Sequence, residues 1–231
     1  MCGRLHVHAA DITELLHEFV ELIHPGPDNL NAAPTEEILV LVADADGTLK
    51  LRPMCWWLTP RWAKQPSTRY SMFNAKSETA ATLPSFREPY KQQRCVVPVS
   101  GFYEWARRQA HKQAYFLRSA KHTGLLLAGL WDRWQGVDAD GQQCQIDSFA
   151  ILTTAASAAM QAVHHRQPVL LDQHRALQWL DPSLPTSELE HYFEPQLVTP
   201  IEARPVSSWV NNARNKDPRC EQAMAESVLL N

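Results

Sequence analysis

The chain has 231 residues, of which 45% are hydrophobic and 20% are charged, and its net charge at pH 7 is −3. These values are typical of a soluble globular protein, and the length allows one large domain with a substantial core. No apolar run approaches the ~20 residues that span a bilayer, and the start lacks the basic and apolar regions of a signal peptide. We therefore expect a single domain over residues 1–231 and no membrane association, in the cytoplasm, or in the nucleus if the source has one.

The predicted elements, taken in chain order, are mostly strands. Residues 3–8 alternate like a strand, and Asp11 with Glu14 resembles a capping box that opens a helix through about Leu22. After a loop rich in proline and asparagine, Asp46-Gly47 predicts a hairpin between strands at 38–42 and 49–53. Further strands are predicted at 95–99, 102–106, 114–118, 125–134, 146–153 and 198–206, and helices at 77–82, 156–163, 172–180 and 186–193. Because strands and helices do not alternate regularly, we predict an α+β fold whose mostly antiparallel sheet curls into a barrel-like core flanked by helices.

The cysteines are too few and too scattered for a structural framework. They number five, with no C-x-x-C pair, and are Cys2, Cys55, Cys95, Cys144 and Cys220. This pattern argues against both a disulfide scaffold and a zinc site. Histidines His6, His8 and His164 have no carboxylate or thiolate at ligand spacing beside them. We predict no metal and no other cofactor.

Cys2 has a chemistry that an internal cysteine lacks. If Met1 is removed, Cys2 carries a free α-amine and a thiol on adjacent carbons. The amine, which like any terminal α-amine has an ordinary pKa of about 8, condenses with an aldehyde, and the thiol then closes on the imine to give a five-membered thiazolidine. Alternatively, Cys2 is a small buried residue at the start of a strand.

Three further positions are candidates for polar chemistry. Glu104 lies between aromatics in an apolar strand, where a carboxylate is suited to acid–base catalysis. The alternative is a glutamate on the solvent face of an edge strand, which would show a similar sequence pattern. His164 follows a predicted helix and is suited to proton transfer or to a structural role. Asn74 ends a loop, where its amide either holds a polar substrate or makes a turn, and nearby Lys76 is suited to pairing with phosphate.

Charge is distributed unevenly along the chain. Residues 61–121 contain twelve basic and three acidic residues, whereas the remainder contains ten basic and 22 acidic residues. Aromatic side chains such as Trp62 and Tyr70 are interleaved with the positive charges, a combination that suits a nucleic-acid backbone with stacked bases. The alternative is a solvated surface balanced in three dimensions by the acidic segments.

Together and in order, these motifs resemble the SRAP family, the SOS-response-associated peptidases understood as abasic-site processing proteins. The resemblance runs from residue 2 to about 215. It rests on the segments MCGR at 1–4, NAAP at 31–34, Trp56 through Pro60, FNAKSET at 73–79, RCVVP at 94–98, GFYEW at 101–105, HHRQP at 164–168, and Val206-Ser207 with VNN at 210–212. Trp57 stands where the family usually has Gly, and Ser100 stands where Asp is common.

The resemblance implies a lyase-like enzyme that binds single-stranded DNA containing abasic sites. Cys2, freed of Met1 by autoproteolytic or peptidase-type processing, would form a thiazolidine DNA–protein crosslink. Asn74, Glu104 and His164 would surround the sugar aldehyde. The DNA-binding residues implied are Arg4, Asn31, Trp56, Trp57, Lys76, Ser207 and Asn212. No obligate protein partner is expected.

Two rival functions remain open from the sequence. One is an N-terminal-cysteine amidohydrolase, such as a glutaminase domain, in which Cys2 attacks an amide carbonyl and an oxyanion hole is required. The other is a DNA-binding module that holds single strands non-covalently and in which Cys2 is inert. Hydrolysis of free glutamine tests the first, and a denaturation-resistant adduct with abasic DNA excludes the second.

Overall fold

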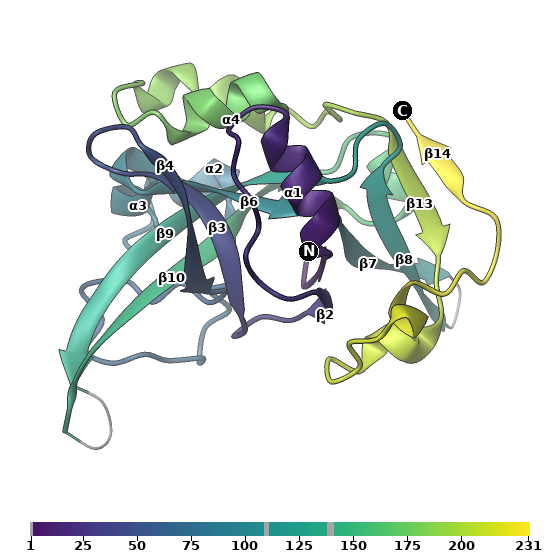
Figure 1. The fold of residues 1–231 in the computed structure, drawn as a ribbon, viewed down its shortest axis with the longest axis horizontal. Coiled ribbons are helices and arrows are strands. Elements are labelled where there is room, and N and C mark those ends of the chain that lie inside the picture. The colour runs from purple at the N-terminus through teal and green to yellow at the C-terminus, as the bar shows by residue number, and fades with distance from the viewer. Residues whose placement is uncertain (1, 109–110, 138–140) are drawn as a thin grey trace.

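The computed structural model describes residues 2–108, 111–137 and 141–231, and the strands form two sheets (Figure 1). The six-stranded sheet has the order β14-β13-β8-β7-β1-β2. Its strands are β1 (Arg4–Val7), β2 (Asn29–Ala32), β7 (Gly101–Arg108), β8 (His111–Ser119), β13 (Ile201–Pro205) and β14 (Val228–Leu230). Every pairing within this sheet is antiparallel.

The eight-stranded sheet closes on itself. Its order is β11-β10-β4-β3-β6-β9-β12, with β5 paired to β10, and β10 also pairs with β9, so that β10, β4, β3, β6 and β9 form a closed barrel. The strands are β3 (Glu37–Ala43), β4 (Leu49–Cys55), β5 (Asn74–Lys76), β6 (Arg94–Val99), β9 (Leu125–Val137), β10 (Gln143–Ala155), β11 (Arg166–Pro168) and β12 (Leu170–Leu171). Among the strand pairs of the described residues, only those of β10 with β4 and with β5 are parallel. The predicted α+β fold with a barrel-like, mostly antiparallel core is confirmed.

Four α-helices are present in the described residues: α1 (Ala9–His17), α2 (Ser77–Ala80), α3 (Arg87–Gln92) and α4 (Gln173–Leu180). Figure 1 shows α1 in front of the junction between the sheets and α4 along the top. Strand β6 is buried along its whole length because it has barrel interior on one side and helices on the other. This two-sided burial explains its unbroken apolar sequence.

The hydrophobic core has two parts. The larger part fills the barrel and extends under α1 and α4, and its largest buried side chains include Trp56, Trp179 and Phe149. A smaller cluster lies on one face of β7 and β8, where Tyr103 and Phe116 pack against Val210 and Cys220. The last two residues come from 3-10 turns at Ser208–Asn211 and Pro218–Glu221, so these turns cover the middle of that face.

Several elements were predicted with the correct type, helix or strand, but their first and last residues differ in the structure. The hairpin at Asp46-Gly47 connects β3 and β4, and Gly47 has a φ of 83°, the left-handed region that favours glycine. Asp172 caps α4 by accepting a hydrogen bond from the amide of Arg175 at 2.8 Å.

The helix predicted from Asp11 to about Leu22 is wrong at both ends. It begins at Ala9, ends at His17, and has His8 at its N-cap. The amide of Ala9 donates instead to the Asp28 side chain at 2.8 Å. A cap supplied from 19 residues away leaves no local signal, so the apparent capping box at Asp11 and Glu14 was misleading.

Two other predicted helices are 3-10 turns. Between 156 and 163 only Met160–Ala162 is helical, because the Ala156 amide donates to the main chain of His165 and the Ser157 amide to the side chain of Gln167. The stretch 186–193 forms turns at Thr186–Glu188 and Glu190–Phe193. Helix α3 and strands β2, β5, β11, β12 and β14 were not predicted.

Candidate active site

Residue 2 lies where three distant segments meet. Cys2 is fully buried immediately before β1. Its main-chain carbonyl accepts a hydrogen bond from Nδ2 of Asn74, at the start of β5, at 2.8 Å. Strands β1 and β7 pair with Arg4 opposite Tyr103, so the antiparallel register carries residue 2 alongside Glu104 and its neighbour Trp105.

The environment of Cys2 favours the thiol over the thiolate. Burial raises the pKa of the Cys2 thiol well above its ordinary value, and the negative charge of Glu104 raises it further. The Sγ atom lies 4.0 Å from the main-chain oxygen of Arg4. Cys2 therefore offers an S–H group at neutral pH, not a preformed anionic nucleophile.

Glu104 is a buried carboxylate of β7. Its residue is only 4% exposed, and Oε1 accepts a hydrogen bond from the amide of Trp105 at 3.2 Å. Strand β7 lies between β8 and β1, so Glu104 is not the edge-strand glutamate of the alternative interpretation. The negative charge of Glu104 acts to raise the pKa of both the Cys2 thiol and the His164 ring.

His164 is half-buried in the loop that precedes β11. Burial lowers the pKa of the ring, and the negative charge of Glu104 acts in the opposite direction. Its Nδ1 lies 3.0 Å from the amide nitrogen of Arg166 and 3.2 Å from the carbonyl oxygen of the same residue, so this nitrogen faces the main chain. The ring of His165 stacks on the His164 ring with centroids 4.2 Å apart.

Glu104 and His164 line the same cavity, which has a volume of about 610 Å³. Its other lining residues are Trp105 and Lys112, from β7 and β8, and residues 161–163 and 165. Lys112 belongs to the basic stretch at 61–121 but to no motif, and only the hairpin register, with Lys112 opposite Arg107, brings it beside Glu104. Three of the four predicted catalytic residues, Cys2, Glu104 and His164, are thus electrostatically connected, and Asn74 is hydrogen-bonded to the first.

Arg166 ties the walls of this site together. Its guanidinium binds both carboxylate oxygens of Glu78, in α2, and the carbonyl and hydroxyl of Thr153, in β10. Strand β10 also pairs with β5, placing Ile151 opposite Asn74. The strand that carries Asn74 and the loop that carries His164 are therefore held by one network.

The structure places the predicted DNA-binding residues in different environments. Lys76 and Asn212 are exposed, whereas Trp57 and Ser207 are partly buried, with Ser207 capping the turn at Ser208–Asn211 through its bond from the Trp209 amide. Arg4 is half-buried, and this burial lowers the pKa of its guanidinium. It donates to the carbonyls of Gly3 and Asn211.

Two of these residues have no surface for DNA. Trp56 is fully buried, stacks on Phe149 and donates from Nε1 to the carbonyl of Phe73 at 2.9 Å. Asn31 is also fully buried and donates to the carbonyls of Val210, Asn212 and Asn215. The predicted DNA contacts of Trp56 and Asn31 are therefore corrected: the first is a core residue and the second anchors the C-terminal turns.

The basic stretch at 61–121 is partly neutralised. Arg61 pairs with Asp132 and Arg118 with Glu202, as the alternative interpretation expected, and Arg94 is buried against main-chain carbonyls. Five other cations of the stretch form no ion pair within residues 2–108, 111–137 and 141–231: Lys64, Arg69, Lys76, Lys112 and Lys121. Of these, Lys112 lines the active-site cavity.

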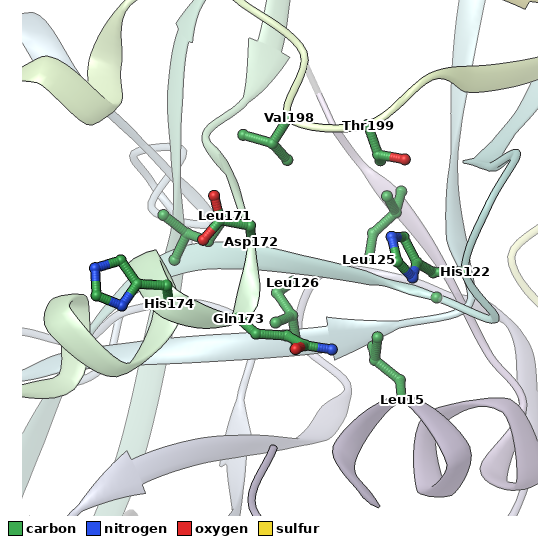
Figure 2. A pocket seen from close by; sticks show the side chains of 11 residues that line it. Leu15, His122, Leu125, Leu126, Leu171, Asp172, Gln173, His174, Val198 and Thr199 are labelled. Atoms are coloured by element: carbon green, nitrogen blue, oxygen red, sulfur yellow. The ribbon is translucent and has the colours of Figure 1, made fainter. Parts of the chain in front are cut away.

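A separate cavity of about 340 Å³ lies away from these residues (Figure 2). Its walls are mainly apolar, with Leu15, Leu126 and Val198 facing the centre. It contains none of the predicted catalytic or DNA-binding residues. Among the described residues, no group of three or more His, Cys, Asp or Glu side chains is arranged to hold a metal ion, and no helix is long and apolar enough to cross a membrane.

The chain is similar to curated proteins that share the name abasic site processing protein. Abasic site processing protein YoqW of Bacillus subtilis is 30% identical over 94% of this chain and 97% of its own length. Abasic site processing protein HMCES of Gallus gallus is 33% identical over 77% of this chain and 59% of its own length. Among solved structures, a Bacteroides thetaiotaomicron protein superposes with a TM-score of 0.79 at 22% identity, covering 96% of this chain and 100% of that one, which shows a shared fold.

The family comparison covers most of the chain. The family described as SOS response associated peptidase (SRAP) matches residues 1–213. This span includes every residue of the site described above. The chain belongs to the SRAP family.

Proposed function

We propose that this protein processes abasic sites in single-stranded DNA by forming a covalent crosslink through Cys2. The observation that supports this most directly is the set of contacts around residue 2. Asn74 donates a hydrogen bond to the Cys2 carbonyl, and the charge of Glu104 acts on the pKa of both the Cys2 thiol and the His164 ring. The relatives named abasic site processing proteins support the same substrate. No other residue of the site combines an amine and a thiol on adjacent carbons once Met1 is removed.

The proposed reaction begins with opening of the sugar. An abasic deoxyribose is a hemiacetal, and His164 accepts the proton of its hydroxyl and delivers it to the ring oxygen, which releases the aldehyde. The neutral state of His164, favoured by its burial, makes it competent to accept that proton.

The second stage joins protein to DNA. The α-amine of Cys2 adds to the aldehyde carbon, and the Glu104 carboxylate carries the two protons of that nitrogen to the oxygen, which leaves as water and gives an imine. The thiol then adds across the C=N bond, its sulfur to carbon and its proton to nitrogen, and the thiazolidine results. Atoms balance with one water released and no oxidant or reductant consumed.

The state of the thiol separates this reaction from amide hydrolysis. A cysteine hydrolase attacks as the thiolate, which burial and Glu104 both disfavour at Cys2. Thiazolidine formation begins with the amine and needs the thiol only afterwards. The protonated thiol therefore favours aldehyde capture over the glutaminase alternative.

The proposed DNA path follows the cations near the cavity. Lys76 is exposed two residues after Asn74, and Lys112 lines the cavity beside Glu104. Arg4, Trp57, Ser207 and Asn212 complete the proposed surface. A phosphate backbone bound by these groups would bring the abasic sugar to Cys2.

The test is a denaturing gel and intact mass measurement after mixing the protein, processed at Met1, with a single-stranded oligonucleotide carrying one abasic site. The native protein should gain the mass of the DNA less one water. Cys2→Ala should give no adduct, whereas the matched control Cys55→Ala, which removes a partly buried thiol elsewhere, should react normally. Normal adduct yield from Cys2→Ala, or glutamine hydrolysis in place of crosslinking, would overturn the proposal.

A further inference from the structure

The loop between β4 and β5 carries positive charge with no counter-charge of its own. No aspartate or glutamate occurs between residues 56 and 77, which contain four cations: Arg61, Lys64, Arg69 and Lys76. Arg61 pairs with Asp132, but the other three form no ion pair with any carboxylate of the described residues. This part of the surface is therefore complementary to an anionic partner.

The loop is held in place at several points. Trp57 donates from Nε1 to the main-chain carbonyl of Ser67 at 3.1 Å, and its ring lies against Phe73 with centroids 5.5 Å apart. Trp134, in β9, donates from Nε1 to the carbonyl of Ala63 at 2.8 Å. The indole groups thus fix the backbone near both ends of residues 63–72, so the side chains between them project from an anchored loop.

Tyr70 is the most exposed aromatic side chain of this loop. It is 68% exposed. The guanidinium carbon of Arg69 lies 5.5 Å from the centroid of the Tyr70 ring, and the amide of Arg69 donates to the Ser67 hydroxyl at 3.2 Å. An exposed aromatic ring beside unpaired cations is the combination that binds single strands, since the ring stacks on a base while the cations contact phosphates.

The loop lies close to the candidate active site. Tyr70 precedes Asn74 by four residues, so their Cα atoms are at most about 14 Å apart, and Asn74 is hydrogen-bonded to the carbonyl of Cys2. Stacked nucleotides of one strand are about 3.4 Å apart along the axis. A strand whose sugar reaches Cys2 therefore needs only a few further nucleotides to reach Tyr70.

We propose that the loop at 63–72 is a second contact for single-stranded DNA, a few nucleotides from the abasic site. Tyr70 stacks on a base, Lys64 and Arg69 bind the backbone phosphates, and Trp57 acts through Ser67 to hold the loop in position. The identity of the partner rests on the proposed function. Residues 61–72 lie between the motifs at 56–60 and 73–79 and belong to neither, so this contact extends the DNA path beyond the residues of those motifs.

The test is fluorescence anisotropy with single-stranded oligonucleotides that carry a tetrahydrofuran residue in place of the abasic sugar. A short oligonucleotide is compared with versions lengthened on the 5′ side or on the 3′ side. Lengthening on one of the two sides should raise the affinity. Tyr70→Ala should remove about fivefold to a hundredfold of that gain, the scale of one base stacked on an aromatic ring, whereas the matched control Tyr70→Phe should bind as the native protein does.

The contributions of base and phosphate can be separated on the lengthened side. Replacing the added bases by tetrahydrofuran residues keeps the phosphates, so it should abolish the effect of Tyr70→Ala and preserve that of Arg69→Gln. Arg69→Gln should also make the slope of log K against log salt shallower by about 0.7. Trp57→Phe, which loses the donor to Ser67, should weaken binding of the lengthened oligonucleotide more than binding of the short one.

Three results would overturn the proposal: native affinity of Tyr70→Ala for every oligonucleotide, equal losses for Tyr70→Ala and Tyr70→Phe, or the same loss on short and lengthened oligonucleotides. The tetrahydrofuran residue has no aldehyde, so the measurement does not depend on Cys2 chemistry. A protein that fails to crosslink genuine abasic DNA but shows the Tyr70-dependent gain would contradict the proposed function and leave this contact standing.

Discussion

The side-chain amide of Asn74 donates to the main-chain carbonyl of Cys2 at 2.8 Å, linking the start of β5 to the residue before β1. The other atom of that amide, Oδ1, is buried without a hydrogen-bond partner among the described residues. One side of Asn74 thus holds the main chain of Cys2, and in the proposed reaction the other side would accept a hydrogen bond from the sugar.

Asn74→Ala should therefore slow crosslinking without unfolding the protein. Loss of one hydrogen bond of about 1 kcal/mol corresponds to roughly a fivefold to tenfold lower rate. Single-turnover crosslinking against time measures the change. Asn29→Ala, which removes a bond to Glu36 outside the site, is the matched control and should leave the rate unchanged. Equal rates for both variants would remove Asn74 from the site.

Glu104→Gln and His164→Gln should each slow crosslinking while leaving the final yield intact. General acid–base groups contribute about 10²–10⁴-fold to a rate, so prolonged incubation still gives product. This behaviour contrasts with Cys2→Ala, in which no bond to DNA can form. A time course over several decades distinguishes slowed from abolished reaction. Native rates in both variants, with folding intact, would exclude both residues from catalysis.

The lowered pKa of His164 fixes the direction of its pH effects. Its folded-state pKa lies below the ordinary value of 6.5 because the ring is partly desolvated. As pH falls below 6.5, the unfolded chain takes up the proton first, so this residue lowers stability in that window. The rate of crosslinking should likewise fall only below pH 6.5 on the His164 limb. His164→Gln should lose that limb when rates are measured against pH.

The barrel and the main strands were predictable because they are encoded locally. The apolar runs of β6 and β9 and the Asp46-Gly47 turn each signal their own structure. The ends of α1 were not predictable, because Asp28 supplies the cap from a distant loop. Short edge strands such as β14 have too little pattern to recognise and exist only because β13 offers a free edge.

The site shows the same division. The motifs containing Cys2, Asn74, Glu104 and His164 are visible in the sequence, and the structure brings them together. The motifs do not reveal which of their side chains are buried. Trp56 and Asn31 belong to equally recognisable motifs, yet both are fully buried. A motif identifies residues under strong constraint, but only packing separates those that support the fold from those available to a ligand. Lys112 is the opposite example, because it belongs to no motif and yet its side chain lines the cavity.

Asn31→Ala should destabilise the C-terminal turns. The side-chain amide of Asn31 bonds the carbonyls of Val210, Asn212 and Asn215, all of which would lose a donor. Leaving such groups unpaired costs about 1–3 kcal/mol. Urea denaturation should show that loss, and hydrogen exchange should accelerate at 208–216. Faster exchange throughout the chain, with no excess in this segment, would contradict the anchoring role.

Glu202→Gln should reduce stability at neutral pH and have no effect in strong acid. Burial by itself raises the pKa of Glu202, but hydrogen bonds from Ser227, Arg118 and Arg204 outweigh it and lower the pKa to about 2. A carboxyl with a lowered pKa stabilises the fold above its unfolded value, and that contribution disappears as pH falls towards 2. Thermal melts at several pH values test this, with exposed Glu226→Gln as control.

The expected loss for Glu202→Gln is about 2 kcal/mol at pH 7, from charge-assisted hydrogen bonds. For a chain of this size that corresponds to a fall in melting temperature of roughly 4–8 °C. The native and Glu202→Gln proteins should converge as the pH approaches that of the folded-state pKa. A constant difference across the whole pH range would mean that shape, and not charge, accounts for the effect.

Binding of single-stranded DNA should depend on salt and on Lys76. Each phosphate neutralised on a single strand releases counterions and gives a slope of about −0.7 in log K against log salt. Lys76 is exposed beside the site and forms no ion pair with the described carboxylates, so Lys76→Glu should weaken binding equally for every sequence and make the salt slope shallower.

Lys50→Glu, at a lysine that already pairs with Asp44, should change binding much less. Fluorescence anisotropy at several salt concentrations measures both quantities. An affinity independent of salt, or equal losses for the two reversals, would assign the basic stretch to a solvated surface instead of a DNA path.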